Sequence, residues 1–439
     1  MHSFLLLLLL STRQLSIKTN NGFRNNKNIV CESLNKIINK KVDNKKYADM
    51  KPSIAVYLQH YLTPSMTFIY RQLMVTSSNY QTYVLCSDML ANTDRFPFEN
   101  IYHKQRNFIR IKKSRYFLKF YSWDKLLSEY PRLSIQQKKY FKSLLINKKI
   151  QLVHAQFGPA GIEILDIAKS LNIPLVVGFH GYDASKLLRL ENYKKNLRKL
   201  FDYAKVIVVS DHMKNSLINI GAMEENIYVI RYGISTDFFS FNERKTIKDK
   251  LATDETLIFL QVSNFVEKKG HRYTLLAFKN YLEKYPNSKL ILAGAGPLLN
   301  VLKNFCSELN ISDKVEFLGL VDKNKVRELM SEADVFLHHS VTSREGDQEG
   351  IPNVIMEAMA TGLIVISSNH SGIPELITNN VDGFLVNERD LEAYSRTLLN
   401  LPSIQNNVGI KARAKILEYY DYKIESEKLN SVYEANLKR

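Results

Sequence analysis

The feature that most constrains the fold is an alternation, repeated through most of the chain, between short apolar runs and helical patterns. The runs have the length of strands and are rich in Val, Ile and Leu. Such alternation is typical of parallel sheets whose strands are joined by crossover helices. The runs are SIAVYL, TYVLCS, LVHAQF, LVVGFH and VIVVS, followed by LIFLQVS, KLILAGAG, KVEFLG, VFLHHS and LIVISS.

A polar stretch divides these runs into two series. Strand periodicity stops within YGISTDFFSFNERKTIKDK, at about residues 232–250, and 439 residues are too many for one compact core. We therefore predict an α/β protein with two Rossmann-like domains that face each other across a cleft, over residues 50–240 and 241–420. Residues 421–439 are predicted to form a C-terminal helix that can cross back to the first domain.

The first 49 residues show no core pattern. The apolar run Phe4–Leu10 is short, whereas a membrane-spanning helix needs about 20 residues. The start also lacks the basic region and the small-residue cleavage site of a secretory signal. We predict that residues 1–49 are a disordered extension or a mis-assigned start, and that the folded protein begins at Met50.

Composition and charge narrow the class of protein. The 45% hydrophobic and 24% charged residues are typical of globular proteins. Cys31, Cys86 and Cys306 lie far apart and form no CxxC pair, which indicates a reducing compartment and disfavours structural zinc. The net charge of +17 is uneven, with +13 over residues 51–240 and −2 over 241–439.

Two glutamates are the main candidate binding residues. Glu349 and Glu357 stand seven residues apart, and Gly350-Ile351-Pro352 between them enters a helix with proline at its first turn. Glu357 is the single charge in IPNVIMEAMA, and a buried carboxylate needs a partner. A helix N-terminus suits a phosphate, while the carboxylates can accept hydrogen bonds from hydroxyls. The pair predicts a nucleotide-sugar site; the alternative, an exposed pair, is disfavoured by the apolar flanks of Glu357.

The surrounding sequence resembles a known family. The run EGIPNVIMEAMATGLIVISSNHSGIPELI is similar to the Glu-x7-Glu signature of family 4 of the retaining glycosyltransferases, particularly the capsule and exopolysaccharide branch of the colanic acid type. The likeness extends over about residues 52–420. It implies a GT-B fold, with Glu349 on the donor sugar and Glu357 on the nucleotide ribose. It also implies that the turn between them meets sugar and phosphate through its main chain: Gly350, Ile351, Pro352 and Asn353.

Two lysines follow the strand LIFLQVS. In the family, a lysine at the position of Lys269 lies against the donor diphosphate and takes the place of the divalent metal that other glycosyltransferases use. Lys268 can assist it. The family usually has an arginine where this chain has Asn264, so one phosphate-binding side chain expected from the resemblance is missing. Without the resemblance, a lysine pair here is typical of solvated surface.

Two further turns are candidates for donor binding. Gly294 and Gly296, in GAGP after the strand KLILAG, allow close backbone approach at the head of the crevice. Leu299 stands where the third glycine of a dinucleotide fingerprint would be, which disfavours a nicotinamide enzyme. Leu320 and Val321 resemble the base-binding turn of the family, although an ordinary strand-end turn is an equal alternative.

The first domain offers one candidate at the reacting centre. His180 ends the strand LVVGFH and precedes a glycine, so its side chain is expected to point toward the cleft. Family members carry a histidine here whose backbone or ring meets the donor sugar. His154 and Thr67 are predicted on the acceptor side, with packing as the alternative for His154.

These residues predict a reaction. The chain is expected to move a sugar from a UDP- or GDP-sugar to a growing, lipid-linked glycan with retention of configuration. No metal and no cofactor are predicted, because no DxD motif and no cluster of ligand spacing occurs. Catalysis would be electrostatic preorganisation around the diphosphate, with His180, Glu349 and Lys269 at the centre. A nucleotide-sugar 2-epimerase of the same architecture and a non-catalytic sugar-binding subunit are the alternatives.

The basic first half predicts a membrane partner. Lys104 to Lys119, KQRNFIRIKKSRYFLK, interleaves cations with aromatic and aliphatic residues. Lys186 to Leu200 places Leu187, Leu190, Tyr193 and Leu197 at helical spacing among cations. We predict docking on an anionic surface at the inner, cytoplasmic face of the cell membrane, with solvated helix faces as the alternative. Nucleic acid is not expected, because no nucleic-acid module is recognisable.

Overall fold

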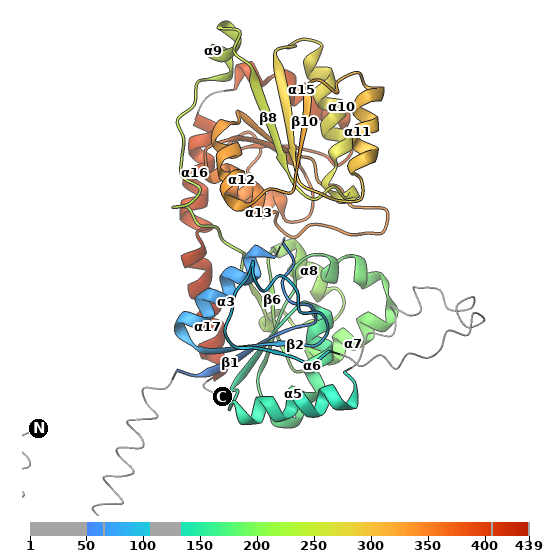
Figure 1. Ribbon diagram of the computed structural model, residues 1–439, viewed down its shortest axis with the longest axis vertical. Coiled ribbons are helices and arrows are strands. Elements are labelled where there is room, and N and C mark those ends of the chain that lie inside the picture. The colour runs from blue at the N-terminus through green and yellow to red at the C-terminus, as the bar shows by residue number, and fades with distance from the viewer. Residues whose placement is uncertain (1–50, 65, 106–132, 405–406, 438–439) are drawn as a thin grey trace, which may run out of the picture. The chain divides into compact units, whose positions relative to one another are not determined.

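The computed structural model describes residues 51–64, 66–105, 133–404 and 407–437. The predicted extension over residues 1–49 and the basic stretch from residue 106 to 119 lie outside the described residues. From Ser53 onward the chain forms one compact unit, and this unit carries two sheets in two lobes (Figure 1).

The first lobe is built on a parallel seven-stranded sheet with the order β3-β2-β1-β4-β5-β6-β7. Its strands are β1 (Ser53–Leu58), β2 (Gln81–Cys86), β3 (Ile101–His103), β4 (Leu152–Gln156), β5 (Leu175–Gly178), β6 (Lys205–Val208) and β7 (Ile227–Val229). Its α-helices are α3 (Thr67–Asn79), α5 (Ile135–Asn147), α6 (Gly158–Leu171), α7 (Glu191–Phe201) and α8 (Asp211–Ile218). Short 3-10 helices are η2 (Tyr182–Ala184), η3 (Lys186–Arg189) and η4 (Glu224–Asn226).

The second lobe repeats this plan with a parallel six-stranded sheet of order β10-β9-β8-β11-β12-β13. Its strands are β8 (Leu257–Val262), β9 (Ser288–Ala293), β10 (Val315–Gly319), β11 (Val335–His338), β12 (Ile364–Ser368) and β13 (Phe384–Val386). Its helices are α9 (Ile247–Ala252), η5 (Glu267–Lys269), α10 (His271–Leu282), α11 (Leu299–Glu308), α12 (Lys323–Glu332), α13 (Asn353–Ala360), α14 (Ile373–Leu376), α15 (Leu391–Leu399) and η6 (Leu401–Ser403).

Each sheet contains the switch point at which ligands bind in doubly wound folds. The chain winds outward from β1 to β3, returns to the other side of β1 at β4 and continues to β7, and β8 to β13 follow the same course. The loops after β1 and β4, and those after β8 and β11, therefore diverge and leave a crevice at the carboxyl edge of each sheet. The predicted fold class and all ten predicted strands are confirmed.

Sequence patterns missed three short strands. β3, β7 and β13 contain three residues each and lie toward the edges of their sheets, with half of their residues or more only partly buried. Three residues are too few to show a periodicity, so pairing with a neighbouring strand is what makes them strands.

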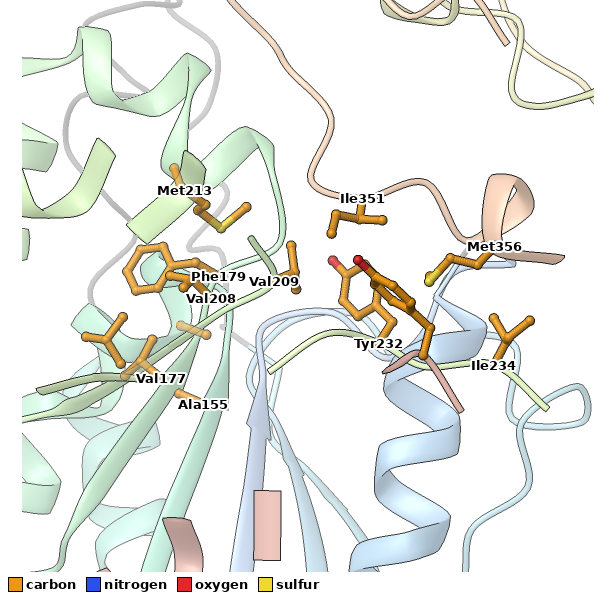
Figure 2. Packing of buried hydrophobic residues seen from close by; sticks show 14 of the residues in the cluster. Ala155, Val177, Phe179, Val208, Val209, Met213, Tyr232, Ile234, Ile351 and Met356 are labelled. Carbon is orange, nitrogen blue, oxygen red and sulfur yellow. The ribbon is translucent and has the colours of Figure 1, made fainter. Parts of the chain in front are cut away.

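The hydrophobic core is continuous between the lobes. Val209, Tyr232 and Ile234 of the first lobe belong to the same buried cluster as Ile351 and Met356 of the second. Figure 2 shows Ile351 next to the ring of Tyr232, with Met356 beside Ile234. The loop that carries Glu349 is thus anchored in the core by Ile351.

The C-terminal helices connect the two lobes. α16 (Asn407–Tyr419) packs on α13, and α17 (Tyr422–Leu437) packs on α3 and β4 of the first lobe (Figure 1). Where the chain crosses, Ile234 and Asp421 form an isolated parallel bridge. The two crossings between lobes, near Ile234 and Asp421, therefore run side by side.

The second basic stretch is not one continuous helix. It is divided between η3 and α7, and Tyr193 and Leu197 of α7 are fully buried in the core. Leu187 and Leu190 are partly buried against the same core. The aromatic and aliphatic side chains of this stretch therefore cannot contribute to the predicted membrane docking, because they pack in the core of the first lobe. The exposed cations of α7 include Lys195 and Lys199.

Candidate active site

A pocket of about 420 Å³ lies where the carboxyl edges of the two sheets face each other. Loops after β1, β2, β4, β5 and β7 line it from the first lobe, and loops after β8, β9, β10 and β11 from the second. The predicted residues that line it are Thr67, His180, Asn264, Lys268, Lys269, Gly294, Leu320, Val321, Glu349, Gly350, Ile351, Pro352, Asn353 and Glu357. His154 and Gly296 are not among the lining residues.

The two glycines of the GAGP turn have different tasks. Gly294 has φ +150°, and a Cβ there would lie 1.9 Å from the main-chain oxygen of Ser263. A Cβ at Gly296 would lie 2.5 Å from the oxygen of Phe265. Both positions therefore let the β9 loop close onto the β8 loop, and Gly294 alone of the two also faces the pocket.

His154 is a core residue and not part of the cleft surface. It is buried on β4, where its Nδ1 lies 2.6 Å from the hydroxyl of Tyr433 on α17. Burial lowers its pKa to about 3, so the ring is neutral. The amide of Gln156 lies between His154 and His180, 3.5 Å from one ring and 2.7 Å from the other. The prediction that His154 shapes the acceptor side is therefore corrected: His154 lies beneath the pocket wall and packs in the core.

Glu349 is held in an ion pair with a predicted phosphate-binding lysine. Nζ of Lys269 lies 2.9 Å from Oε1 of Glu349, and Lys268 pairs with Asp347 at 3.0 Å. Burial alone would raise the pKa of Glu349, but the charges of Lys269 and Lys268 outweigh it and lower the pKa to about 2. The carboxylate is therefore ionised at any pH at which the protein works.

A buried histidine fixes the main chain at Glu349. The N–H of Glu349 donates to Nε2 of His370 over 3.1 Å, and Nδ1 of His370 lies 2.6 Å from Oε1 of Glu388. Because Nε2 accepts, the proton of the ring is on Nδ1 and is donated to Glu388. Burial lowers the pKa of His370, although Glu388 opposes this. The ring is thus neutral, as the bond from Glu349 requires.

The side-chain contacts of Glu357 differ from those of Glu349. Glu357 lies in the second turn of α13, it is 8% exposed, and its side chain lines the pocket. Its carboxylate forms no hydrogen bond or ion pair with any residue that the structure describes. Burial raises its pKa, partly opposed by the charges of Arg71 and Lys323. A buried carboxylate of this kind is costly unless a ligand supplies hydrogen bonds.

The N-terminus of α13 is also open toward the pocket. Pro352 precedes the first helical residue and provides no side-chain cap. Asn353 and Val354 begin the helix, line the pocket and have main-chain N–H groups that no residue of the helix can satisfy. Oδ1 of Asn353 is buried without a partner among the described residues. Together with Glu357, this helix end is prepared for a polar ligand with both donors and acceptors.

His180 is clamped on both ring nitrogens. Nε2 lies 2.7 Å from Oε1 of Gln156, and Nδ1 lies 3.2 Å from the hydroxyl of Tyr232. With Gln156 accepting, Nε2 carries the proton and Nδ1 can accept. Burial lowers the pKa of His180 to about 3, with a further contribution from His154. The ring is neutral and fixed, so it cannot act as a cationic acid.

Asp183 holds the loop that carries His180. Its Oδ1 accepts from the N–H groups of His180 and Gly181 at 2.9 and 3.0 Å, and its Oδ2 accepts from Gly158 at 3.0 Å. Burial raises the pKa of Asp183 to about 6 even though these donors oppose it. This carboxylate therefore ties the loop after β5 to the N-terminus of α6.

Sequence reasoning missed Asp183, Phe157, His370 and Glu388. Asp183 and His370 do follow predicted strands, in FHGYD and in ISSNHSG, so the rule that function follows strand ends could have found them. The same rule applies to Phe157, which ends the predicted strand LVHAQF. Glu388 has no local signal, because it follows β13, which the sequence patterns missed, and its role depends on a contact with His370, 18 positions away.

Comparison with known proteins places this architecture. Residues 242–417 match the family described as Glycosyl transferases group 1, and residues 83–238 match Glycosyltransferase Family 4. The amylovoran biosynthesis glycosyltransferase AmsK of Erwinia amylovora is 34% identical over 289 residues, which is 65% of this chain and 70% of that protein. The chain belongs to the family 4 glycosyltransferases. A putative colanic acid biosynthesis glycosyltransferase of Escherichia coli, WcaL, is 31% identical over 291 residues, or 64% of this glycosyltransferase and 70% of WcaL.

Solved structures agree with the fold of this glycosyltransferase. Anabaena Alr3699/HepE, in complex with UDP and glucose, superposes with a TM-score of 0.68 at 17% identity, over 88% of this chain and 100% of that chain. Sucrose-phosphate synthase of Thermosynechococcus elongatus superposes with a TM-score of 0.66 at 17% identity, over 88% and 99%. The fold is GT-B. Within the described residues, no helix of this glycosyltransferase has both the length and the apolar character needed to cross a bilayer.

Proposed function

We propose that this glycosyltransferase moves a sugar from a nucleoside diphosphate sugar to a glycan acceptor in exopolysaccharide synthesis, with retention of configuration. The observation that carries the proposal is the carboxylate of Glu357, which has no hydrogen-bond or ion-pair partner among the described residues and lies at an open helix N-terminus in the same pocket as the Glu349–Lys269 pair. The relatives named for amylovoran and colanic acid synthesis support the pathway class. The UDP and glucose held by HepE support a nucleotide sugar as donor, with UDP and GDP both open.

The second lobe would bind the donor. Ribose hydroxyls would donate to Glu357, and the first N–H groups of α13 would donate to the diphosphate. Lys269 and Lys268 already stand beside the pocket, and each can exchange its carboxylate partner for a phosphate oxygen. Released from Lys269, Glu349 would accept hydrogen bonds from hydroxyls of the donor sugar.

The reaction needs stabilisation of charge more than proton transfer by a side chain. As the bond between the anomeric carbon and the phosphate oxygen breaks, negative charge develops on the diphosphate and positive charge on the sugar. The lysines and the helix N-terminus would stabilise the negative charge on the diphosphate. The neutral ring of His180 would not oppose the positive charge on the sugar. The acceptor oxygen would then bond to the anomeric carbon on the same face, and its proton would pass to the departing phosphate oxygen.

A panel of UDP- and GDP-sugars tests the proposal. The matching donor should raise the melting temperature, because ligand binding stabilises the folded state by mass action. It should also be hydrolysed slowly, and NMR should show the released sugar first in the configuration of the donor. An inverted first product would overturn retention. An epimerised nucleotide sugar formed without acceptor would favour the 2-epimerase, and binding without turnover would favour a non-catalytic subunit.

We also propose that the basic first lobe docks on an anionic membrane and takes a lipid-linked acceptor there, at the cytoplasmic face. The exposed cations of α7 and the excess of +13 over residues 51–240 support electrostatic attraction. Sedimentation with vesicles should need anionic lipid and weaken at high salt and in Lys195→Glu/Lys199→Glu. Equal binding to neutral vesicles would overturn electrostatic docking.

A further inference from the structure

The first-lobe wall of the pocket is a group of aromatic rings around His180. The ring centroid of His180 lies 4.6 Å from Phe157 and 5.1 Å from Phe68. Tyr182 lies 5.6 Å from Phe157, and Tyr232 lies 4.0 Å from Phe68. All five side chains line the pocket. We call these residues the aromatic wall.

The backbone of Phe157 adopts a conformation that a residue with a large side chain rarely takes. Its φ of 75° and ψ of 145° are rare for a bulky residue, so the surrounding contacts must hold this strained conformation. Its N–H donates to Gly178 over 2.7 Å, and the next N–H donates to Asp183. These bonds turn the ring of Phe157 toward the pocket instead of the sheet. Tyr182, beside it, is 38% exposed.

One guanidinium stands on the same side of the pocket. Among the described residues that line the pocket from the first lobe, Arg95 is the one with a full charge. Arg95 is exposed and forms no ion pair with any described residue. Its guanidinium lies 5.8 Å from the ring centroid of Phe96. A planar guanidinium without an ion-pair partner among the described residues matches a carboxylate or a phosphate, which it can bind through two parallel hydrogen bonds.

We propose that the aromatic wall and Arg95 form the acceptor subsite, and that its ligand is a glycan ending in a pyranose with an anionic group close to the acceptor hydroxyl. One face of a pyranose presents C–H bonds and is apolar, which suits stacking on Phe157 and Tyr182. The anionic group would bind Arg95. The inference rests on the proposed function: if the donor fills the second-lobe half of the pocket, the first-lobe half is left for the acceptor.

The anion can belong to the sugar or to the lipid carrier. A uronic acid places a carboxylate on the acceptor ring, and a polyprenyl carrier places a diphosphate next to its first sugar. Three probes distinguish the sources: p-nitrophenyl glucoside, p-nitrophenyl glucuronide and a short prenyl diphosphate glucoside. Each is tested in the presence of UDP by saturation-transfer NMR for binding, and with the matching donor for transfer.

One of the two anionic probes should bind about tenfold more tightly than the neutral glucoside. Arg95→Gln should remove this preference, whereas Arg396→Gln, a matched surface change on α15, should keep it. Equal binding of all three probes to the wild type, or a preference that survives Arg95→Gln, would overturn the role of Arg95.

Tyr182→Ala should raise the KM for the acceptor probe by about tenfold, with Tyr182→Phe close to wild type, because the ring and not the hydroxyl makes the stack. An unchanged acceptor KM in Tyr182→Ala would overturn the stacking platform. If the wild-type protein binds none of the nucleotide sugars, that result would instead count against the proposed function itself.

Discussion

The two walls of the pocket are built by the same fold and differ in chemistry. The second-lobe wall carries Lys268, Lys269, Lys323, Asp322, Glu349 and Glu357, and two of the lysines are engaged in ion pairs. The first-lobe wall carries aromatic rings and, among the described residues, one full charge. Both stand at the switch point of a doubly wound sheet, so the difference lies in the loops and not in the scaffold. A charged wall is suited to bind a diphosphate through ion pairs. An aromatic wall is suited to bind a ligand through contact with the faces of its rings.

The largest loss of transfer is expected from the charged wall. Glu349→Gln and Glu357→Gln should each lower kcat/KM by about 10- to 150-fold, because each removes charge-assisted hydrogen bonds worth about 1.5–3 kcal/mol. Steady-state kinetics with varied donor measures the loss, with Glu392→Gln on the exposed face of α15 as the control. Turnover at the wild-type level in both variants would show that this wall does not bind the donor.

The same two variants should differ in stability. The pKa of Glu349 lies near 2 in the folded protein against an ordinary 4.5, so its ion pair stabilises the fold by an amount on the order of 3 kcal/mol above pH ~4.5. Glu349→Gln should therefore lower the free energy of unfolding at neutral pH, and its difference from wild type should shrink as the pH falls from about 4.5 toward 2.

Glu357→Gln should not destabilise the free protein. Burial raises the pKa of Glu357, so ionisation costs stability, and this cost appears as the pH rises through the raised pKa. The uncharged amide of Glu357→Gln has the same shape and does not carry this cost in stability. Urea unfolding at pH 7 should show an unchanged or higher stability for Glu357→Gln, and a loss as large as that of Glu349→Gln would reveal a partner for this carboxylate in the free protein.

A smaller effect is expected beneath the aromatic wall. Tyr433 reaches His180 through His154 and Gln156. Tyr433→Phe removes one buried hydrogen bond, and should lower kcat several-fold and the free energy of unfolding by about 1–2 kcal/mol, with the donor KM unchanged. Equal kcat with reduced stability would limit Tyr433 to a structural role.

The smallest change is expected from metal removal. Transfer should be unaffected by a chelator, since lysines and a helix N-terminus would supply the positive charge around the diphosphate. Activity assays with and without chelator test this, and loss of turnover restored by magnesium or manganese would reveal a metal that binds together with the donor.

Local patterns were enough for the frame of the molecule but not for the details of the site. The ten longer strands, the two-lobe plan and the positions of Glu349, Glu357 and His180 at the pocket could be predicted from such patterns, whereas the position of Lys269 was predicted from the family resemblance. The pairing of Glu349 with Lys269 could not, because 80 residues separate them and a sequence pattern does not report which side chains meet. The same holds for His370, which positions the main chain of Glu349 from the next strand end.

The sequence by itself determined the ten longer strands and the edge of each sheet on which the polar residues fall, because these depend on periodicity within about ten residues. Only the tertiary structure decided how charge is distributed at the site. Within the part of the chain that the structure describes, it left the carboxylate of Glu357 without a hydrogen-bond or ion-pair partner and paired Glu349 with Lys269. It also fixed both ring nitrogens of His180 and buried His154 in the core. It also turned the apolar residues of α7 inward. Burial and long-range pairing set the energy of a charge, and both are properties of the packed chain rather than of any stretch of it.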